Sequence, residues 1–103
     1  MIFDPSSALT RYAPGKGVTT LVSFTGASSA WAQINATAAP RYYTFACTQD
    51  CFVVAGPSNV GAAANTDFLY LAGIHDFIIK PGDGIRVISN GVDGILTVAP
   101  TGV

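Results

Sequence analysis

Apolar and polar residues alternate along most of this chain, with the period of two that is typical of β-strands. Residues 18–24 place Val22 and Phe24 on one side of a predicted strand, and residues 30–37 alternate in the same way. Apolar residues do not recur at helical spacing beyond one or two turns anywhere in the chain. The pattern therefore predicts an all-β protein.

Two turn signals divide residues 74–98 into three predicted strands. Lys80-Pro81-Gly82-Asp83 has proline and glycine at the two central positions where a type II turn favours them. Asn90-Gly91 is typical of a two-residue type I′ hairpin, because both central positions need a positive φ. We therefore expect these three strands to pair with one another as an antiparallel meander.

The Asn90-Gly91 hairpin would fix the register of the last two strands. Val87 would lie opposite Gly94, and Arg86 would lie diagonal to Asp93 and within reach of it. One side of the pair is then apolar and expected to face the core. Its residues are Ile85, Val87, Val92, Leu96 and Val98.

Another hairpin is predicted between residues 41–47 and 51–55, around a three-residue loop. Its register pairs Phe45 with Val53 and sets Cys47 opposite Cys51, close enough for a disulfide or for two reduced core thiols. Neither side of this pair is polar, so both sides need cover, from a second layer or from another subunit. The candidate subunit interface consists of Phe52, Val54, Phe77 and Ile79.

Gly56 to Thr66 is rich in glycine, alanine and asparagine and predicts a loop, and residues 67–72 predict a further strand. About eight short strands separated by glycine, proline and asparagine turns indicate a compact antiparallel β-sandwich, jelly-roll-like, or a flattened barrel. Residues 18–103 would form this single domain. Residues 1–17, with at most one or two helical turns after Asp4 and a proline-glycine break, would form an irregular N-terminal arm.

Charged residues are scarce in this chain, and their scarcity limits the classes of partner that we expect. Charged residues make up 11% of the sequence, glutamate is absent and the net charge is −1, whereas roughly 25% is usual. We therefore expect part of the surface to be buried against other chains, as in a homo-oligomer. The five basic residues form no cluster, which argues against nucleic acid. There is no apolar run of 18 residues and no export signal, so we expect a soluble protein without a membrane partner.

Catalytic and metal-binding residues are also scarce. One histidine, one cysteine pair and no glutamate cannot supply the usual zinc or non-haem iron ligand sets within one chain. His75 and Asp76 are adjacent in a predicted strand and would point to opposite faces. Asn35-Ala36-Thr37 matches a glycosylation sequon but is expected to be a polar strand position. We expect no catalytic residue, metal or cofactor, and no enzymatic activity.

The segments RYYTFACTQDCFVVAG, DFLYLAGIHDFIIKPGDGIRVIS and GILTV, with a glycine- and alanine-rich loop between the first two, resemble small virion proteins of tailed phages. The resemblance covers about residues 41–98, and the cysteine pair is not a feature of that group. It implies a capsid decoration (cement) protein that binds the outside of a phage head as a homotrimer and contacts the major capsid protein. It also implies a virion location after assembly in the host cytoplasm. The arm residues that would contact the capsid are Phe3, Leu9, Arg11, Tyr12 and Lys16.

Other functions stay open on sequence grounds. A head-fibre, tail or baseplate component would fit the same composition. A carbohydrate-binding sandwich would use Trp31, Tyr42 and Tyr43 as stacking surfaces, although such a module would be expected to carry an export signal. A small enzyme is a third alternative, and the missing donors argue against it.

Overall fold

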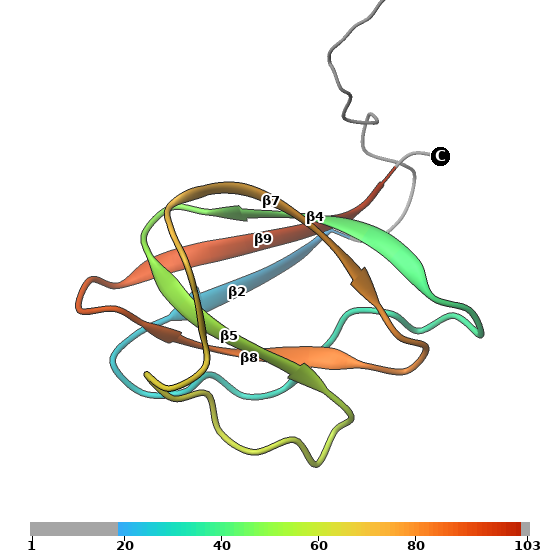
Figure 1. Cartoon of the computed structure of the whole chain (residues 1–103), viewed down its shortest axis with the longest axis horizontal. Coiled ribbons are helices and arrows are strands. Elements are labelled where there is room, and N and C mark those ends of the chain that lie inside the picture. Colours follow the sequence, from blue (N-terminus) through green and yellow to red (C-terminus); the bar gives the residue numbers. More distant parts are fainter. Residues whose placement is uncertain (1–18, 102–103) are drawn as a thin grey trace, which may run out of the picture.

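The computed structural model describes residues 19–101, which form two four-stranded antiparallel sheets packed face to face (Figure 1). The predicted antiparallel β-sandwich is confirmed, and the two sheets do not close into a barrel. Sheet I has the strand order β2 (Thr20–Phe24), β9 (Gly94–Pro100), β4 (Arg41–Cys47) and β7 (Gly73–Ile79). Sheet II has the order β3 (Ala32–Gln33), β8 (Gly84–Ser89), β5 (Cys51–Gly56) and β6 (Phe68–Tyr70).

The core lies between the two sheets and is built from alternate residues of their strands. Phe24, Phe45, Leu96, Ile85 and Val87 are each at most 2% exposed. Their burial follows from the period of two, because every second side chain points inward. The predicted inner sides of residues 20–24 and of the last two strands are thereby confirmed, apart from one residue. Val92 was expected in the core and is 56% exposed, in the connection between β8 and β9.

The predicted hairpin at Asn90-Gly91 is wrong. β8 pairs with β3 and β5 in sheet II, whereas β9 pairs with β2 and β4 in sheet I, so residues 90–93 cross from one sheet to the other. Gly91 does have the positive φ, 97°, that the pair indicated. Arg86 does not reach Asp93, because its guanidinium donates to the carbonyl oxygens of Ser29 and Val60. The alternation of apolar and polar residues correctly predicted which side of each strand is buried. It did not predict the pairing, because a crossing between sheets buries the same side as a hairpin.

The turn at Lys80–Asp83 has the predicted type II geometry, although its place in the fold differs. Gly82 has a φ of 79°, and the Asp83 amide donates to the Lys80 carbonyl at 3.1 Å. The turn connects β7 in sheet I to β8 in sheet II. The three strands predicted to pair as a meander therefore alternate between the sheets.

The predicted hairpin between residues 41–47 and 51–55 is also a crossing. β4 pairs with β7 and β9, and β5 pairs with β6 and β8. Phe45 lies opposite His75 and Val98 instead of Val53. The two cysteines nevertheless meet, because the three-residue connection turns from one sheet directly onto the other.

The segment predicted as a strand at residues 30–37 is mostly irregular. Ala32–Gln33 pairs with β8, and the indole of Trp31 donates to the Gly56 carbonyl at 3.0 Å. A Cβ atom at Gly84 would collide with the Ala32 carbonyl and the Trp31 ring, so this close approach requires glycine. Asn35, expected on a polar strand face, is fully buried instead.

The loop predicted at residues 56–66 contains no strand after Gly56, where β5 ends. Its backbone is fixed by short-range hydrogen bonds, including Val60 amide to Pro57 carbonyl and Asp67 amide to Ala64 carbonyl. The predicted N-terminal arm, residues 1–17 with its candidate capsid contacts, lies outside the described residues.

Candidate interaction surfaces

The outer face of sheet I is exposed and apolar. Strand alternation turns Leu21, Tyr42, Ile74, Ile78 and Ile95 outward, with exposed fractions between 41% and 66%. Register places Leu21, Thr97, Ala46 and Ile74 in one row across the four strands. Tyr42 and Ile78 are direct neighbours in another row. Large apolar side chains therefore lie at both ends of this surface, which we call the sheet I face.

Asp76 is the one charged residue on the sheet I face within the described strands. It lies opposite Thr44, whose hydroxyl donates to its carboxylate at 3.0 Å. The rest of the face between the large residues is made of small or hydroxyl-bearing side chains. They are Ser23, Thr44, Ala46, Thr97 and Ala99.

The predicted subunit interface was placed on the wrong side of β7. Ile79 is 4% exposed and belongs to the core, and Phe77 packs inward against Phe45 and Tyr70 with ring centroids 4.4 and 4.7 Å away. Ile74 and Ile78 occupy the outward positions of the same strand. Each side of the strand carries two large apolar residues and one polar residue, with His75 inside and Asp76 outside, so the apolar pattern alone does not show which side is outer.

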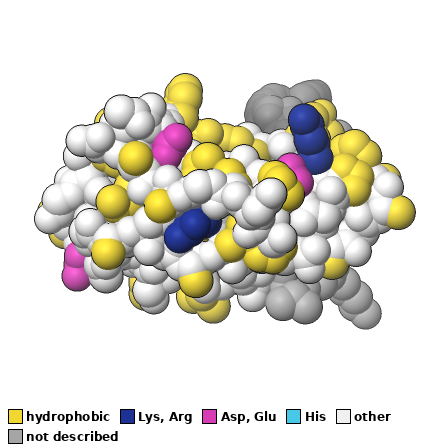
Figure 2. Space-filling model, turned by 90° about the horizontal axis from the view of Figure 1, so that it is seen from below, with side chains coloured by type: hydrophobic (Ala, Val, Ile, Leu, Met, Phe, Trp, Pro, Cys, Tyr) yellow, Lys and Arg dark blue, Asp and Glu magenta, His cyan; other side chains and the backbone are white. Residues whose placement is uncertain are grey.

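The other two predicted interface residues, Phe52 and Val54, alternate with the buried Cys51 and Val53 and lie half-buried on the outer side of β5. Figure 2 shows the molecule from the side of sheet II, where charged side chains are few and hydrophobic ones are scattered among uncharged polar atoms. Phe52 lines a groove on this side.

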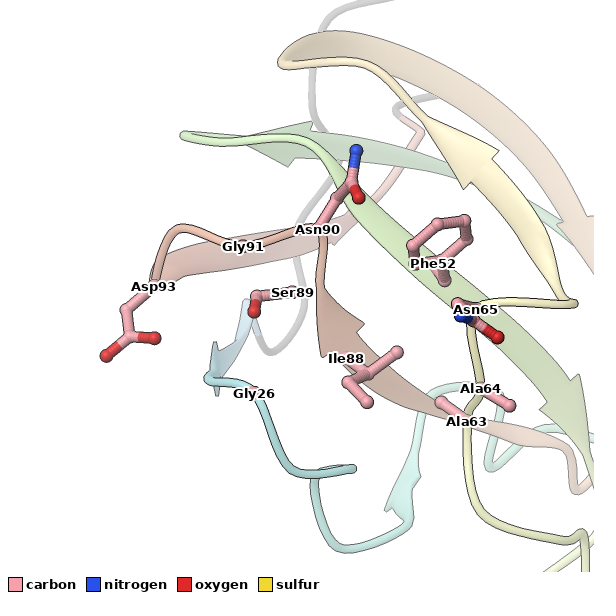
Figure 3. A pocket seen from close by; sticks show the side chains of 10 residues that line it. All are labelled: Gly26, Phe52, Ala63, Ala64, Asn65, Ile88, Ser89, Asn90, Gly91 and Asp93. Atoms are coloured by element: carbon pink, nitrogen blue, oxygen red, sulfur yellow. The ribbon is translucent and has the colours of Figure 1, made fainter.

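That groove has a volume of about 650 Å³ and lies over the end of β8 (Figure 3). It runs from Phe52 and Asn65 at one end to Asp93 at the other, and Ile88 points toward Ala63 and Ala64. Its lining residues come from four separate segments of the chain. They are Gly26, Phe52, Ala63, Ala64, Asn65, Ile88, Ser89, Asn90, Gly91 and Asp93.

Hydrogen bonds from backbone amides attach the walls of the groove to neighbouring segments. The Ala63 amide donates to the Ser28 hydroxyl at 2.9 Å, and the Ser89 amide donates to the Thr25 carbonyl at 2.8 Å. Beside the groove, the Arg86 guanidinium of β8 donates to the Ser29 and Val60 carbonyls, which belong to the two segments that continue into its walls. The groove is therefore a fixed part of the fold.

The three aromatic residues expected to stack on carbohydrate do not share a surface. Tyr43 is 3% exposed and faces the core, whereas the adjacent Tyr42 is 60% exposed on the sheet I face. Trp31 is half-buried and bonded to the Gly56 carbonyl. The stacking surface that the carbohydrate-binding alternative would need from these three residues is therefore not formed.

Cys47 and Cys51 are buried where β4 passes into β5, with their Sγ atoms 3.7 Å apart and no disulfide between them. The thiol of Cys51 donates to the sulfur of Cys47. This bond lowers the pKa of Cys47, because it stabilises the thiolate, and the same bond together with burial raises the pKa of Cys51. The prediction that the two thiols lie together is right, although they lie between sheets.

His75 lies on the inner side of β7 and has contacts that are typical of a packed residue. Its Nε2 atom is 2.8 Å from the Leu71 carbonyl, and its ring is 5.3 Å from that of Tyr70.

Within residues 19–101, no group of three or more histidine, cysteine or acidic side chains could hold a metal ion. In the same part of the chain, no helix is long and apolar enough to cross a membrane.

Comparison of the chain with protein-family models, with curated proteins and with solved structures found no match.

Proposed function

We propose that this protein is a non-enzymatic structural component of a virion, a capsid decoration protein that works as a homo-oligomer. The sheet I face is the observation that carries the proposal. It presents five large apolar side chains and a single carboxylate, which is typical of a surface that a partner covers. The resemblance to small tailed-phage proteins supplies the capsid as the larger partner and three as the number of subunits.

Burial of such a face is sufficient to hold an assembly together. A standard interface covers about 800 Å² on each partner, and the apolar half of that area at about 25 cal/mol per Å² contributes about 10 kcal/mol from each partner before the costs of association. The face has little charge, so its association should depend weakly on salt. Electrostatic steering is not needed to explain association through this face.

The test uses the Ile74→Lys, Ile78→Lys double variant of the full chain. Both side chains are 56% exposed, so lysines there should leave the fold intact and oppose burial of the sheet I face. Light scattering coupled to size exclusion at micromolar concentration should show an oligomer for the unaltered chain and a monomer for the variant. Val92→Lys is the matched control, because Val92 is also 56% exposed but lies outside sheet I.

Electron microscopy of the particle with which the protein copurifies then distinguishes a shell position from a fibre, tail or baseplate position. A monomeric unaltered chain that binds no particle would refute the proposal.

A further inference from the structure

We propose that the groove over β8 binds a neutral carbohydrate. The inference goes beyond the proposed structural role and uses the opposite side of the sandwich. Because the groove lies on sheet II, it remains open when the sheet I face is covered by another subunit or by a shell. The chain would then have one attaching surface and one that faces solution.

The lining combines apolar surface with polar groups that are free to bind. Phe52 and Ile88 offer apolar contact, and the side chains of Asn65, Asn90 and Asp93 have no hydrogen-bond partner among the described residues. An amide both donates and accepts, and a carboxylate accepts strongly. A sugar ring has the complementary surface, since it presents an apolar C–H face edged by hydroxyl groups that donate and accept.

Other ligand classes fit the lining less well. It contains no lysine or arginine, so it lacks the positive charge that phosphate or nucleic acid requires. One carboxylate does not provide the several oxygen ligands that calcium or magnesium needs. Alanine and glycine form much of the rest, which leaves too little apolar area for a lipid chain. A neutral polyol is the class that remains.

The size and rigidity of the groove suit a short oligosaccharide. Its volume of about 650 Å³ lies within the usual range for small-molecule sites. Gly26 and Gly91 leave space for a ring, because a Cβ atom at either position would meet no other atom within 4 Å. The hydrogen bonds from Ala63 to Ser28 and from Ser89 to Thr25 hold the walls before a ligand arrives, which lowers the ordering cost of binding.

The experiment begins with the full chain on an array of neutral oligosaccharides built from glucose, galactose, mannose and N-acetylhexosamines. The best binder is then titrated into ¹⁵N-labelled protein. The amide signals of Ala63–Asn65 and Ile88–Asn90 should shift as sugar is added, until the groove is saturated. The amide signals of the sheet I strands should not shift. No binding at millimolar sugar would overturn the proposal.

The Asn65→Ala, Asp93→Ala double variant should weaken binding at least about tenfold, because two groups that bond sugar hydroxyls are lost. Both residues are exposed, so the fold should survive, and a thermal melt checks this. Asn59→Ala is the matched control, an exposed asparagine of the same loop that does not line the groove. Undiminished affinity in the double variant would place the sugar elsewhere and refute the assignment.

The Ile74→Lys, Ile78→Lys variant separates this proposal from the structural one. It should bind the sugar with unchanged affinity even as a monomer, because its substitutions lie on the other sheet. If this variant stayed folded but no longer bound the sugar, the groove would not be independent of the sheet I face.

Discussion

The side chain of Asn35 makes four hydrogen bonds, which connect the 35–39 loop with the end of β7. Its Nδ2 atom donates to the carbonyls of Ala39 and Ile79, each at 2.8 Å, and its Oδ1 atom accepts from the amide and hydroxyl of Thr37. The amide is fully buried and fully bonded. It therefore holds the irregular 35–39 loop against the end of β7, which explains why a polar group is tolerated there.

Asn35→Ala should lower the free energy of unfolding by about 1–3 kcal/mol, because the Ile79 carbonyl loses a donor at a buried site and the Ala39 carbonyl keeps only the Thr37 hydroxyl. Asn35→Asp should be at least as damaging, since a carboxylate would face the same two carbonyl oxygens. Urea denaturation measures both. Asn59→Ala provides the control, because Asn59 is an exposed asparagine, and its free energy of unfolding should stay within about 0.5 kcal/mol of the unaltered chain. An equally small effect at Asn35 would show that the loop does not depend on this amide.

At the scale of elements, the connection from β4 to β5 decides the architecture, because it takes the chain from one sheet to the other within three residues. Cys47 and Cys51 lie on either side of it and face each other across the core. A disulfide here would close a very short loop. It would therefore reduce the conformational entropy of the unfolded chain only slightly and would add little stability.

The Cys47→Ser, Cys51→Ser double variant should remain folded and soluble, with a lower melting temperature, because two buried thiols are replaced by more polar hydroxyls. Mild oxidation of the unaltered chain with oxidised glutathione should add no more than about 2 kcal/mol. Thermal melts with and without a reductant measure both effects, and a thiol assay reports the oxidation state. Complete loss of soluble protein in the variant would show that the pair is essential to the fold.

At the scale of the whole molecule, the described residues contain a closed core that begins at β2. The strands of both sheets contribute to it, and Val22 and Phe24 of β2 are buried within it. The first 17 residues contain two prolines and two glycines, which disfavour regular secondary structure. Their contribution is therefore expected to concern a partner and not the stability of the sandwich.

Deletion of residues 1–17 should shift the melting temperature by less than about 3 °C, which corresponds to well under 1 kcal/mol for a domain of this size. Particle binding by the shortened chain should weaken, since Phe3, Leu9, Arg11, Tyr12 and Lys16 are lost. Calorimetry and co-sedimentation with the particle measure the two effects separately. A large drop in melting temperature would mean that the arm belongs to the core.

Local sequence patterns were sufficient to predict the fold class, the inner side of most strands and the type II turn at Lys80–Asp83. Each of these depends on residues close together in the chain. Alternation decides which side chains of β8 and β9 are buried, and Pro81-Gly82 favours one turn conformation wherever that turn lies. The nearness of Cys47 and Cys51 also follows from a connection of only three residues.

Strand pairing and the choice of exposed faces depend on contacts between distant segments, which no local pattern specifies. A hairpin and a crossing between sheets bury the same alternate residues, so the pattern around Gly91 could not distinguish them. β7 has two large apolar residues on each side, and its packing in sheet I made Ile79 internal and Ile78 external. The groove brings together four segments distant in sequence, and no local pattern specifies such an arrangement.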